Sequence, residues 1–395
     1  MRTRVAIIGA GPAGLLLGHL LQRAGIDSVI LEDCTQAHVE ARIRAGVLEQ
    51  GTVDLLEEAG VAARLRQQGM VHHGIDLLFD GQRHHIDLSG LTGGRAITVY
   101  GQHEVVRDLI GARQACGAPL LFEASQVALH GLDSQSPSVS FDQGGQRHVL
   151  ACDFIAGCDG SHGVSRQAVP AGALQVFERS YPFAWLGILA KAAPAAHELI
   201  YASHARGFAL FSMRSPEITR LYLQCRPDED LAGWTDRRIW DELHARLETG
   251  DGWHLNEGPV LQKGITPMRS LVTEPMQYGR LFLAGDAAHI VPPTGAKGMN
   301  LAVADVRNLA HALVTHYRHG RDDLLAGYSS ACLACVWRAE HFSWWMTSLL
   351  HRFDDHTPFT ARLQRAELAY VCASQAASRM LAENYVGLPF APLPA

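Results

Sequence analysis

The stretch Gly9-Ala10-Gly11-Pro12-Ala13-Gly14 decides the fold, because it spells G-x-G-x-x-G between a predicted strand and a predicted helix. Residues 5–8 form a short apolar run typical of a buried strand, and residues 13–24 predict a helix that Gly25 can end. Residues 28–31 predict a second strand. The three glycines allow a tight turn, approach of the backbone to a pyrophosphate, and close packing of helix on sheet. The opening therefore predicts a βαβ unit in a parallel sheet that binds a dinucleotide.

An acidic residue follows the second predicted strand at the expected place. Glu32 ends that strand, and its carboxylate can hydrogen-bond the ribose hydroxyls of an adenosine. NAD and FAD share this half of their structure, so the opening alone does not separate them. Two later segments favour a flavin: residues 157–160 (Gly-Cys-Asp-Gly) and the Gly285-Asp286 turn each follow an apolar run. Asp286 can reach a ribityl chain, and the helix predicted from Gly298 would direct positive potential to the flavin ring.

The rest of the chain predicts a mixed α/β protein. Residues 72–97 and 181–267 contain short strand-like runs with polar interruptions, which predict a mixed or antiparallel sheet. Residues 281–284 predict a return to a buried parallel strand. From Gly298 to about Glu383 the apolar spacing is helical.

Composition narrows the class of protein. Of 395 residues, 47% are hydrophobic and 19% charged, which is typical of a soluble globular protein. A net charge of −6 gives no basic excess for nucleic acid or an anionic membrane, and no apolar run is long enough for a membrane span. The eight scattered cysteines favour a reducing cytoplasm. Cys332 and Cys335 form a lone pair without further zinc-type ligands, so no metal site is predicted.

These motifs, in this order, resemble the single-component FAD aromatic hydroxylases. The resemblance runs from Val5 to Leu388 and is most specific in residues 42–50 (RIRAGVLEQ), 285–301, 342–347 (FSWWMT) and 383–388 (ENYVGL). It implies a Rossmann-type FAD-binding domain, an inserted sheet-rich substrate domain and a helical C-terminal part. The segments expected for these three parts are 1–71, 98–180 and 268–345 for the first, 72–97 and 181–267 for the second, and 346–395 for the third.

The resemblance is strongest to the branch of this family that acts on 4-hydroxybenzoate. It implies that FAD is reduced by NADH or NADPH as a transient co-substrate and then reacts with O2. The resulting flavin hydroperoxide would hydroxylate 4-hydroxybenzoate to 3,4-dihydroxybenzoate. Two alternatives remain: the same chemistry on a related benzoate, such as 3-hydroxybenzoate or 4-aminobenzoate, and a flavoprotein that binds an aromatic acid without turnover. The resemblance also implies a homodimer.

The same resemblance implies the residues that contact FAD. Arg42 and Arg44 would face the pyrophosphate and the flavin, where a guanidinium fork suits oxyanions. Arg220 would position a mobile flavin. The full expected set is Gly9, Gly11, Gly14, Glu32, Arg42, Arg44, Gln102, Asp159, Arg220, Asp286, Met299 and Asn300.

Three residues are expected at the carboxylate end of the substrate: Ser212, Arg214 and Tyr222. Ser212 and Arg214 have the same parity, so on an extended strand both side chains face one side. A guanidinium among apolar neighbours suits a benzoate carboxylate, since bidentate pairing offsets its desolvation.

At the hydroxyl end of the ring the resemblance places Tyr201 and Pro293. Tyr201 would pass a proton to Tyr385 and then to an exposed imidazole, His72, because a phenolate attacks more readily than a phenol. An apolar wall that excludes water is expected from Trp185, Leu199 and Leu210.

Nicotinamide contacts are expected at Asp33, His38, His162 and Arg269. NADPH-preferring members of the family resemble each other in placing an arginine directly after the ribose-binding glutamate. Here that position holds Asp33, an acid that would repel the 2′-phosphate. We therefore expect a weakened preference for NADPH, with NADH used comparably or better.

Overall fold

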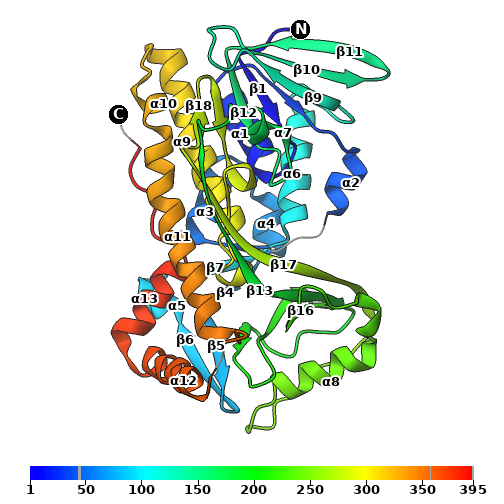
Figure 1. Cartoon of the computed structure of the whole chain (residues 1–395), viewed down its shortest axis with the longest axis vertical. Helices are drawn as coiled ribbons and strands as arrows, with labels where there is room; N and C mark the ends of the chain where they lie inside the picture. Colours follow the sequence, from blue (N-terminus) through cyan, green and yellow to red (C-terminus); the bar gives the residue numbers. More distant parts are fainter. Residues whose placement is uncertain (43–45, 356, 394–395) are drawn as a thin grey trace.

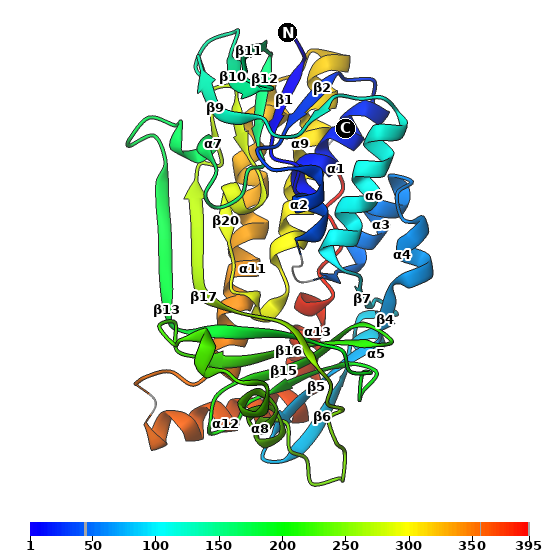
Figure 2. The same ribbon diagram turned by 90° about the vertical axis from the view of Figure 1, so that its right-hand side faces the viewer.

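The computed structural model describes residues 1–42, 46–355 and 357–393. The molecule is elongated, with a parallel sheet and its helices at one end and a larger, mostly antiparallel sheet at the other (Figure 1). The strands β13 (Gln175–Ala190) and β17 (Val260–Glu274) run side by side between the two ends, and the helix α11 (Tyr328–Leu350) spans the same distance (Figure 2).

The parallel sheet has the strand order β18-β19-β12-β1-β2-β8. Its members are β1 (Val5–Ile8), β2 (Ser28–Leu31), β8 (Leu120–Leu121), β12 (Phe154–Gly157), β18 (Gln277–Tyr278) and β19 (Leu281–Leu283). Only β18 runs antiparallel to its neighbour. Every residue of β1, β2 and β12 is buried, as expected of a parallel sheet that is covered on both faces. The predicted βαβ opening is confirmed, and α1 (Pro12–Arg23) begins at Pro12, because proline suits the first position of a helix.

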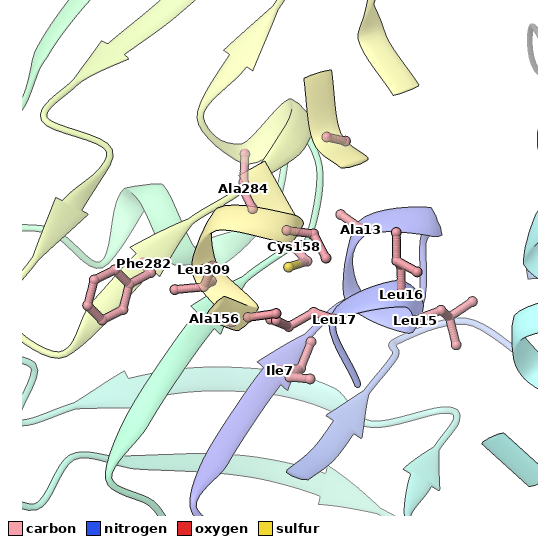
Figure 3. Packing of buried hydrophobic residues seen from close by; sticks show 14 of the residues in the cluster. Ile7, Ala13, Leu15, Leu16, Leu17, Ala156, Cys158, Phe282, Ala284 and Leu309 are labelled. Carbon is pink, nitrogen blue, oxygen red and sulfur yellow. The ribbon is translucent and has the colours of Figure 1, made fainter. Parts of the chain in front are cut away.

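The core of this end lies between the sheet and two helices, α1 and α9 (Gly298–His319). Figure 3 shows Leu17 of α1 and Leu309 of α9 gathered with Ile7 and Ala156 of the sheet. All four side chains are within 1% of complete burial. This close packing fixes the glycine-rich turn and the start of α9 relative to each other.

The larger sheet has the order β20-β17-β13-β16-β15-β14-β5-β6, and only β14 and β5 pair in parallel. The remaining bounds are β5 (Gly74–Phe79), β6 (Gln82–Asp87), β14 (Leu199–Ala202), β15 (Ala209–Ser215), β16 (Ile218–Cys225) and β20 (His289–Ile290). The predicted mixed sheet is confirmed. Sequence reasoning missed α8 (Asp236–Arg246), although Thr235 caps it and its buried residues Ile239, Trp240 and Leu243 have helical spacing.

The strands β13 and β17 continue through the predicted segment boundaries near residues 181 and 267. Two hydrophobic clusters surround the two sheets, and the cluster of the larger sheet also includes buried residues of α11 and of the helices that follow it in the chain. The exact division of the chain stays a prediction.

The chain ends in the helices that the apolar spacing predicted: α10 (Asp323–Ala326), α11, α12 (Pro358–Ala373) and α13 (Gln375–Tyr385). The other helices are α2 (Gln36–Ala41), α3 (Gln50–Glu58), α4 (Ala63–Gln68), α5 (Leu88–Thr92), α6 (Gln102–Ala115) and α7 (Val164–Gln167), with 3-10 turns η1 (Leu231–Gly233), η2 (Gly285–Ala287) and η3 (Pro293–Gly295). Two small sheets contain β3 (Val47–Leu48), β4 (Met70–His72) and β7 (Ile97–Val99), and β9 (Ser125–His130), β10 (Ser138–Gln143) and β11 (Gln146–Ala151). Among the described residues, no helix is long and apolar enough to cross a membrane.

Candidate active site

The glycine-rich turn leaves an opening at the N-terminus of α1. Gly9 has a φ of +102°, and a Cβ there would lie 2.4 Å from the carbonyl oxygen of Cys158. A Cβ on Gly14 would lie 2.0 Å from the carbonyl oxygen of Gly9, so both positions require glycine for packing. A Cβ on Gly11 would meet nothing within 4 Å. Gly9 and Gly14 therefore shape the turn, while the space beside Gly11 is open for a pyrophosphate.

Two acidic side chains fit the sugar parts of a flavin dinucleotide. Glu32 accepts hydrogen bonds from the backbone N–H of Ala10 at 2.7 Å and of Cys34 at 3.2 Å, so its carboxylate is fixed beside the glycine turn. Burial, with Asp33 next to it, raises the pKa of Glu32. Asp159 accepts from Ser165 N–H through Oδ2, whereas its buried Oδ1 has no partner in the part of the chain that the structure describes. Because a buried acceptor without a donor is unfavourable, Oδ1 fits a ligand hydroxyl.

The beginning of α9 presents free backbone donors. Gly298, Met299 and Asn300 are its first three residues, and their N–H groups have no intrahelical partner, which suits an electron-rich ring. The Asn300 side chain is already committed: Oδ1 accepts from Glu49 N–H and the Thr52 hydroxyl, and Nδ2 donates to two carbonyl groups. Any flavin contact of Asn300 would therefore use its backbone.

The other residues expected at FAD are spread over several elements. Asp286 lies in η2, directly after β19, and Gln102 is the first residue of α6. Arg42 is exposed at the end of α2, and Arg44 lies outside the described residues. Arg220 lies on β16, and its guanidinium is 5.1 Å from the ring centre of Tyr222. Its buried Nε has no hydrogen-bond partner among residues 1–42, 46–355 and 357–393.

One face of the larger sheet gathers most of the expected substrate residues. Tyr201 on β14 lies opposite Leu210 on β15, and Leu210 lies opposite Tyr222 on β16. In the next row Ser212 lies opposite Arg220. Directly opposed residues of neighbouring strands share a face, and so do residues two apart along one strand. The sheet register therefore brings together side chains from three strands.

Arg214 lies on β15 two residues beyond Ser212. The register of β15 and β16 shifts between Met213 and Ser215, so Arg214 lies in a β-bulge. Burial lowers its pKa, with Tyr222 opposing this effect. Burial would raise the pKa of Tyr222, but the charges of Arg220 and Arg214 outweigh burial and the pKa is lowered. This end of the face is therefore strongly electropositive and suits a carboxylate.

The hydroxyl groups of Tyr201 and Tyr385 share a hydrogen bond of 2.5 Å. Tyr201 comes from β14 and Tyr385 from the last residue of α13, and both are buried. Burial raises the pKa of both phenols, so both are neutral at physiological pH. Two neutral hydroxyls in contact can pass a proton without either residue becoming a stable anion.

His72 departs from the expectation in one respect. Its side chain is only 1% exposed rather than solvent-facing, at the end of β4, which pairs with β7 in a small sheet. Burial, with His73 and His197 nearby, lowers the pKa of His72 to about 4. Its Nδ1 has no hydrogen-bond partner among the described residues. No described hydrogen bond links it to Tyr385, so its part in proton transfer stays a prediction.

The expected apolar wall lies in the same part of the protein. Leu199, Leu210 and Trp185 are buried, and the Trp185 ring centre lies 4.8 Å from that of Tyr222. Sequence reasoning missed a neighbour, His351, whose Nε2 accepts a hydrogen bond of 2.7 Å from the Trp185 indole. No motif marks His351 among the 21 histidines of the chain. Pro293 is the exposed first residue of η3, and Thr294 behind it is buried.

The expected nicotinamide residues lie on separate elements. Asp33 and His38 are exposed in the segment that follows β2, and His162 is exposed before α7. Arg269 lies on β17, with its guanidinium 3.7 Å from Glu178. Hydrogen bonding to Glu32 lowers the pKa of Asp33, which keeps this exposed residue anionic.

Comparison with known proteins identifies the family of this chain. The model of an FAD-binding domain family matches residues 2–343. The chain is 51% identical to the p-hydroxybenzoate hydroxylase of Acinetobacter baylyi over 99% of its own length and 96% of that protein. It is 24% identical to a probable NADH-specific resorcinol 4-hydroxylase of Rhodococcus jostii, over 83% of this chain and 60% of that protein.

Solved structures share the fold. A p-nitrophenol 4-monooxygenase from Pseudomonas putida matches with a TM-score of 0.83 at 18% identity, over 98% of this chain and 99% of that one. At this identity the likeness concerns the fold alone. The family model and the 51% identical relative carry the assignment further: this chain belongs to the FAD-dependent aromatic hydroxylases, in the family of p-hydroxybenzoate hydroxylase.

Proposed function

We propose that this enzyme hydroxylates 4-hydroxybenzoate next to its ring hydroxyl, giving 3,4-dihydroxybenzoate, with FAD, O2 and a reduced nicotinamide. The substrate assignment rests on one observation, the distribution of charged and hydroxyl groups over one face of the larger sheet. Arg214 and Arg220 make one end cationic beside Tyr222, while the hydroxyl pair of Tyr201 and Tyr385 lies at the other. A ring with a carboxylate at one end and a hydroxyl opposite it matches this pattern.

At the cationic end, Arg214 would bind the substrate carboxylate together with the hydroxyl groups of Ser212 and Tyr222. Ser212 is buried, and within the described residues its hydroxyl makes only a long contact of 3.5 Å to the carbonyl oxygen of Met213. It can therefore turn toward a ligand without breaking a strong bond. Hydrogen bonds between a buried guanidinium and a carboxylate are among the stronger polar contacts in proteins.

At the opposite end, Tyr201 would accept the proton of the substrate hydroxyl and Tyr385 would take a proton from Tyr201 in turn. The ring carbon next to an ionised hydroxyl is richer in electrons, so it attacks an electrophilic oxygen faster. Pro293 and His72 complete the proposed set, with His72 as the group that passes the proton onward. Trp185, Leu199 and Leu210 would exclude water from the reacting atoms.

FAD would be held by the glycine turn, Glu32, Asp159, Asp286 and the first N–H groups of α9. The bound flavin supplies the redox chemistry, taking hydride from the nicotinamide and activating O2. Gln102, Arg42, Arg44 and Met299 are the further proposed contacts, and Arg220 would position the flavin ring. Asp33, His38, His162 and Arg269 are proposed to meet the nicotinamide coenzyme.

The direct test is turnover of the purified, FAD-loaded protein with 4-hydroxybenzoate and O2, using NADH and NADPH in parallel. Formation of 3,4-dihydroxybenzoate, identified by chromatography, is the expected result. Nicotinamide oxidation without this product would remove the substrate assignment, and 3-hydroxybenzoate and 4-aminobenzoate would then be compared. Binding of the aromatic acid with no nicotinamide oxidation would instead favour a binding protein without turnover.

A homodimer in the cytoplasm is also proposed. Phe359, Leu363 and Tyr370 on α12 are 70%, 55% and 61% exposed, and their spacing places them on one side of the helix. The eight cysteines are all free, which supports a reducing compartment. Light scattering during size-exclusion chromatography would give the mass, and Leu363→Glu should produce monomers if α12 forms the contact.

A further inference from the structure

His351 connects the aromatic wall of the substrate face to the long helix α11. It is the first residue after α11, and its backbone N–H donates to the carbonyl oxygen of Thr347. Its side chain accepts from the Trp185 indole at Nε2 and contacts the same Thr347 carbonyl oxygen through Nδ1 at 3.1 Å. The ring is completely buried.

These two partners allow only one form of the imidazole. A backbone carbonyl only accepts, so Nδ1 must carry the hydrogen, and an indole only donates, so Nε2 must be free to accept. If the ring carried a second proton, the Nε2–H group of His351 would face the N–H group of the Trp185 indole, and neither could accept a hydrogen bond. Burial also lowers the pKa of His351 to about 3, so the neutral form persists over the pH range of enzyme assays.

The imidazole is held in orientation by aromatic neighbours. It stacks on Phe183 with ring centres 4.8 Å apart and on Phe208 with ring centres 4.2 Å apart. Trp185 is stacked on Phe208 and lies against Tyr222, whose hydroxyl is expected to help Arg214 bind the carboxylate. His351 therefore holds one edge of the indole through a hydrogen bond, and the indole packs beside Tyr222 on the same face of the sheet.

The same turn of α11 also reaches the loop that contains Pro293. The Thr347 hydroxyl donates to the carbonyl oxygen of Ser343 at 2.7 Å and lies 2.8 Å from the Thr294 hydroxyl. Because the Thr347 hydrogen is used by Ser343, Thr294 must donate to Thr347. Thr347 therefore makes two links. Its carbonyl oxygen holds His351, which accepts from the Trp185 indole, and its hydroxyl holds Thr294 in the loop that contains Pro293.

We propose that His351 is a positioning residue for the aromatic acid, acting through its hydrogen bond with Trp185 to hold the Trp185–Tyr222 wall against the substrate. The proposal rests on the proposed function, because it assigns a role at the same site. It does not require His351 to touch substrate or flavin. What matters is a hydrogen-bond acceptor at Nε2 within an uncharged side chain.

Two variants separate the hydrogen bond from simple packing. His351→Gln keeps a neutral acceptor, since its amide oxygen is the same number of bonds from Cβ as Nε2. His351→Met keeps a similar apolar volume but leaves the indole N–H without a partner, a buried donor that costs free energy. Each is made in the parent and in a Trp185→Phe background, where no indole N–H remains.

The readouts are the Kd for 4-hydroxybenzoate, from the change in flavin absorbance, and the product formed per nicotinamide oxidised. We expect His351→Met to raise the Kd about three- to tenfold and to lower the product yield, and His351→Gln to stay within about twofold of the parent. In the Trp185→Phe background, His351→Met should add less than about a twofold change. FAD content and melting temperature serve as controls for folding.

The proposal is overturned if His351→Gln is as impaired as His351→Met, or if the Met change has the same effect with and without the indole N–H. It is equally overturned if neither readout changes. Should His351→Met not fold, His351→Leu takes its place in both backgrounds, because it also leaves the Trp185 indole N–H without an acceptor. Failure of the parent to hydroxylate 4-hydroxybenzoate would instead contradict the proposed function.

Discussion

Tyr201 and Tyr385, 184 positions apart in the chain, share a hydrogen bond of 2.5 Å deep inside the protein. Their rings are nearly perpendicular, at 86°, with centres 6.0 Å apart. The first comes from the middle of the larger sheet and the second from the end of the last helix. Correct assembly of the C-terminal helices is therefore a condition for the proposed proton path.

Tyr385→Phe removes one hydroxyl of this pair and leaves the ring in place. Without a partner for its proton, Tyr201 can no longer deprotonate the substrate hydroxyl efficiently. Because positioned acid–base groups contribute about 10²- to 10⁴-fold to a rate, we expect product formation to fall at least tenfold, with the nicotinamide still oxidised. Chromatography of products beside nicotinamide absorbance measures both quantities. Tyr370→Phe, at an exposed position, is the matched control, and an unchanged product yield in Tyr385→Phe would contradict the proton path.

Arg214→Gln tests the carboxylate end. Hydrogen bonds to a charged group contribute about 1.5–3 kcal/mol, so the Kd for 4-hydroxybenzoate should rise about 10- to 150-fold. Binding of 4-methylphenol, which lacks the carboxylate, should change little. Arg226→Gln is the control, since Arg226 is an exposed arginine paired with Asp228. Equal losses for both ligands would show general damage to the pocket and exclude a specific contact.

Local geometry explains why the nucleotide-binding end was predictable. The glycine turn and its flanking strands depend on contacts between residues close in sequence, such as Gly9 and Gly14, so the pattern contains most of the information. The substrate face is different, because it depends on the register of strands far apart in the chain. Only resemblance to a family could place Tyr201 beside Tyr385, and nothing indicated His351.

Some details could not be read from the sequence at all. The burial of His72 depends on the small β4–β7 sheet, which forms between distant segments. The Asn300 side-chain amide hydrogen-bonds Val47 and Thr52 and so joins α9 to that segment, although the family resemblance implied a cofactor contact. The α8 helix is a different case, because the spacing of its buried residues was visible and was overlooked.

Gly11→Ala should separate cofactor binding from folding. A Cβ at this position meets no protein atom within 4 Å, and Gly11 has a φ of −74°, so the protein without FAD should fold normally. The methyl group would occupy the space expected for the pyrophosphate, and we expect the Kd for FAD to rise more than tenfold, about 1.4 kcal/mol or more. Fluorescence titration of the apoprotein gives the value. Gly111→Ala in α6 is the control and should bind FAD normally; equal affinity in Gly11→Ala would place the pyrophosphate elsewhere.

Asp33→Arg tests the assignment of the coenzyme site. Asp33 is exposed and anionic, so it would repel the 2′-phosphate that distinguishes NADPH from NADH. Reversing its charge should raise the kcat/KM ratio of NADPH to NADH about tenfold, an energy of about 1.4 kcal/mol. The effect of Asp33→Arg on this ratio should become smaller at high ionic strength, since exposed charges are screened. Asp54→Arg on α3 is a control of equal charge change, and a similar ratio in both variants would refute the assignment.

Glu340 on α11 gives the protein a pH-dependent stability. Its side chain is buried, Oε2 accepts from the Ser270 hydroxyl at 2.9 Å, and Oε1 has no partner among the described residues. Burial raises the pKa of Glu340 from 4.5 to about 7. Between these two values the folded protein binds more protons than the unfolded chain. The free energy of unfolding must therefore fall as the pH rises from about 4.5 to 7, and this contribution stops changing above pH 7.

Glu340→Gln removes this titration while keeping a neutral side chain of the same shape. At pH 8 the parent holds a buried carboxylate with one unsatisfied oxygen, whereas the variant holds no charge. We expect the variant to be more stable than the parent at pH 8, by on the order of 2 kcal/mol, and to differ little from it at pH 5. Urea denaturation at pH 5, 6, 7 and 8 measures the difference. Glu58→Gln, at an exposed position on α3, should leave the pH profile unchanged. If the stability difference between Glu340→Gln and the parent is the same at pH 5 and pH 8, Glu340 does not titrate between them and its carboxyl group must find a partner that keeps it ionised throughout.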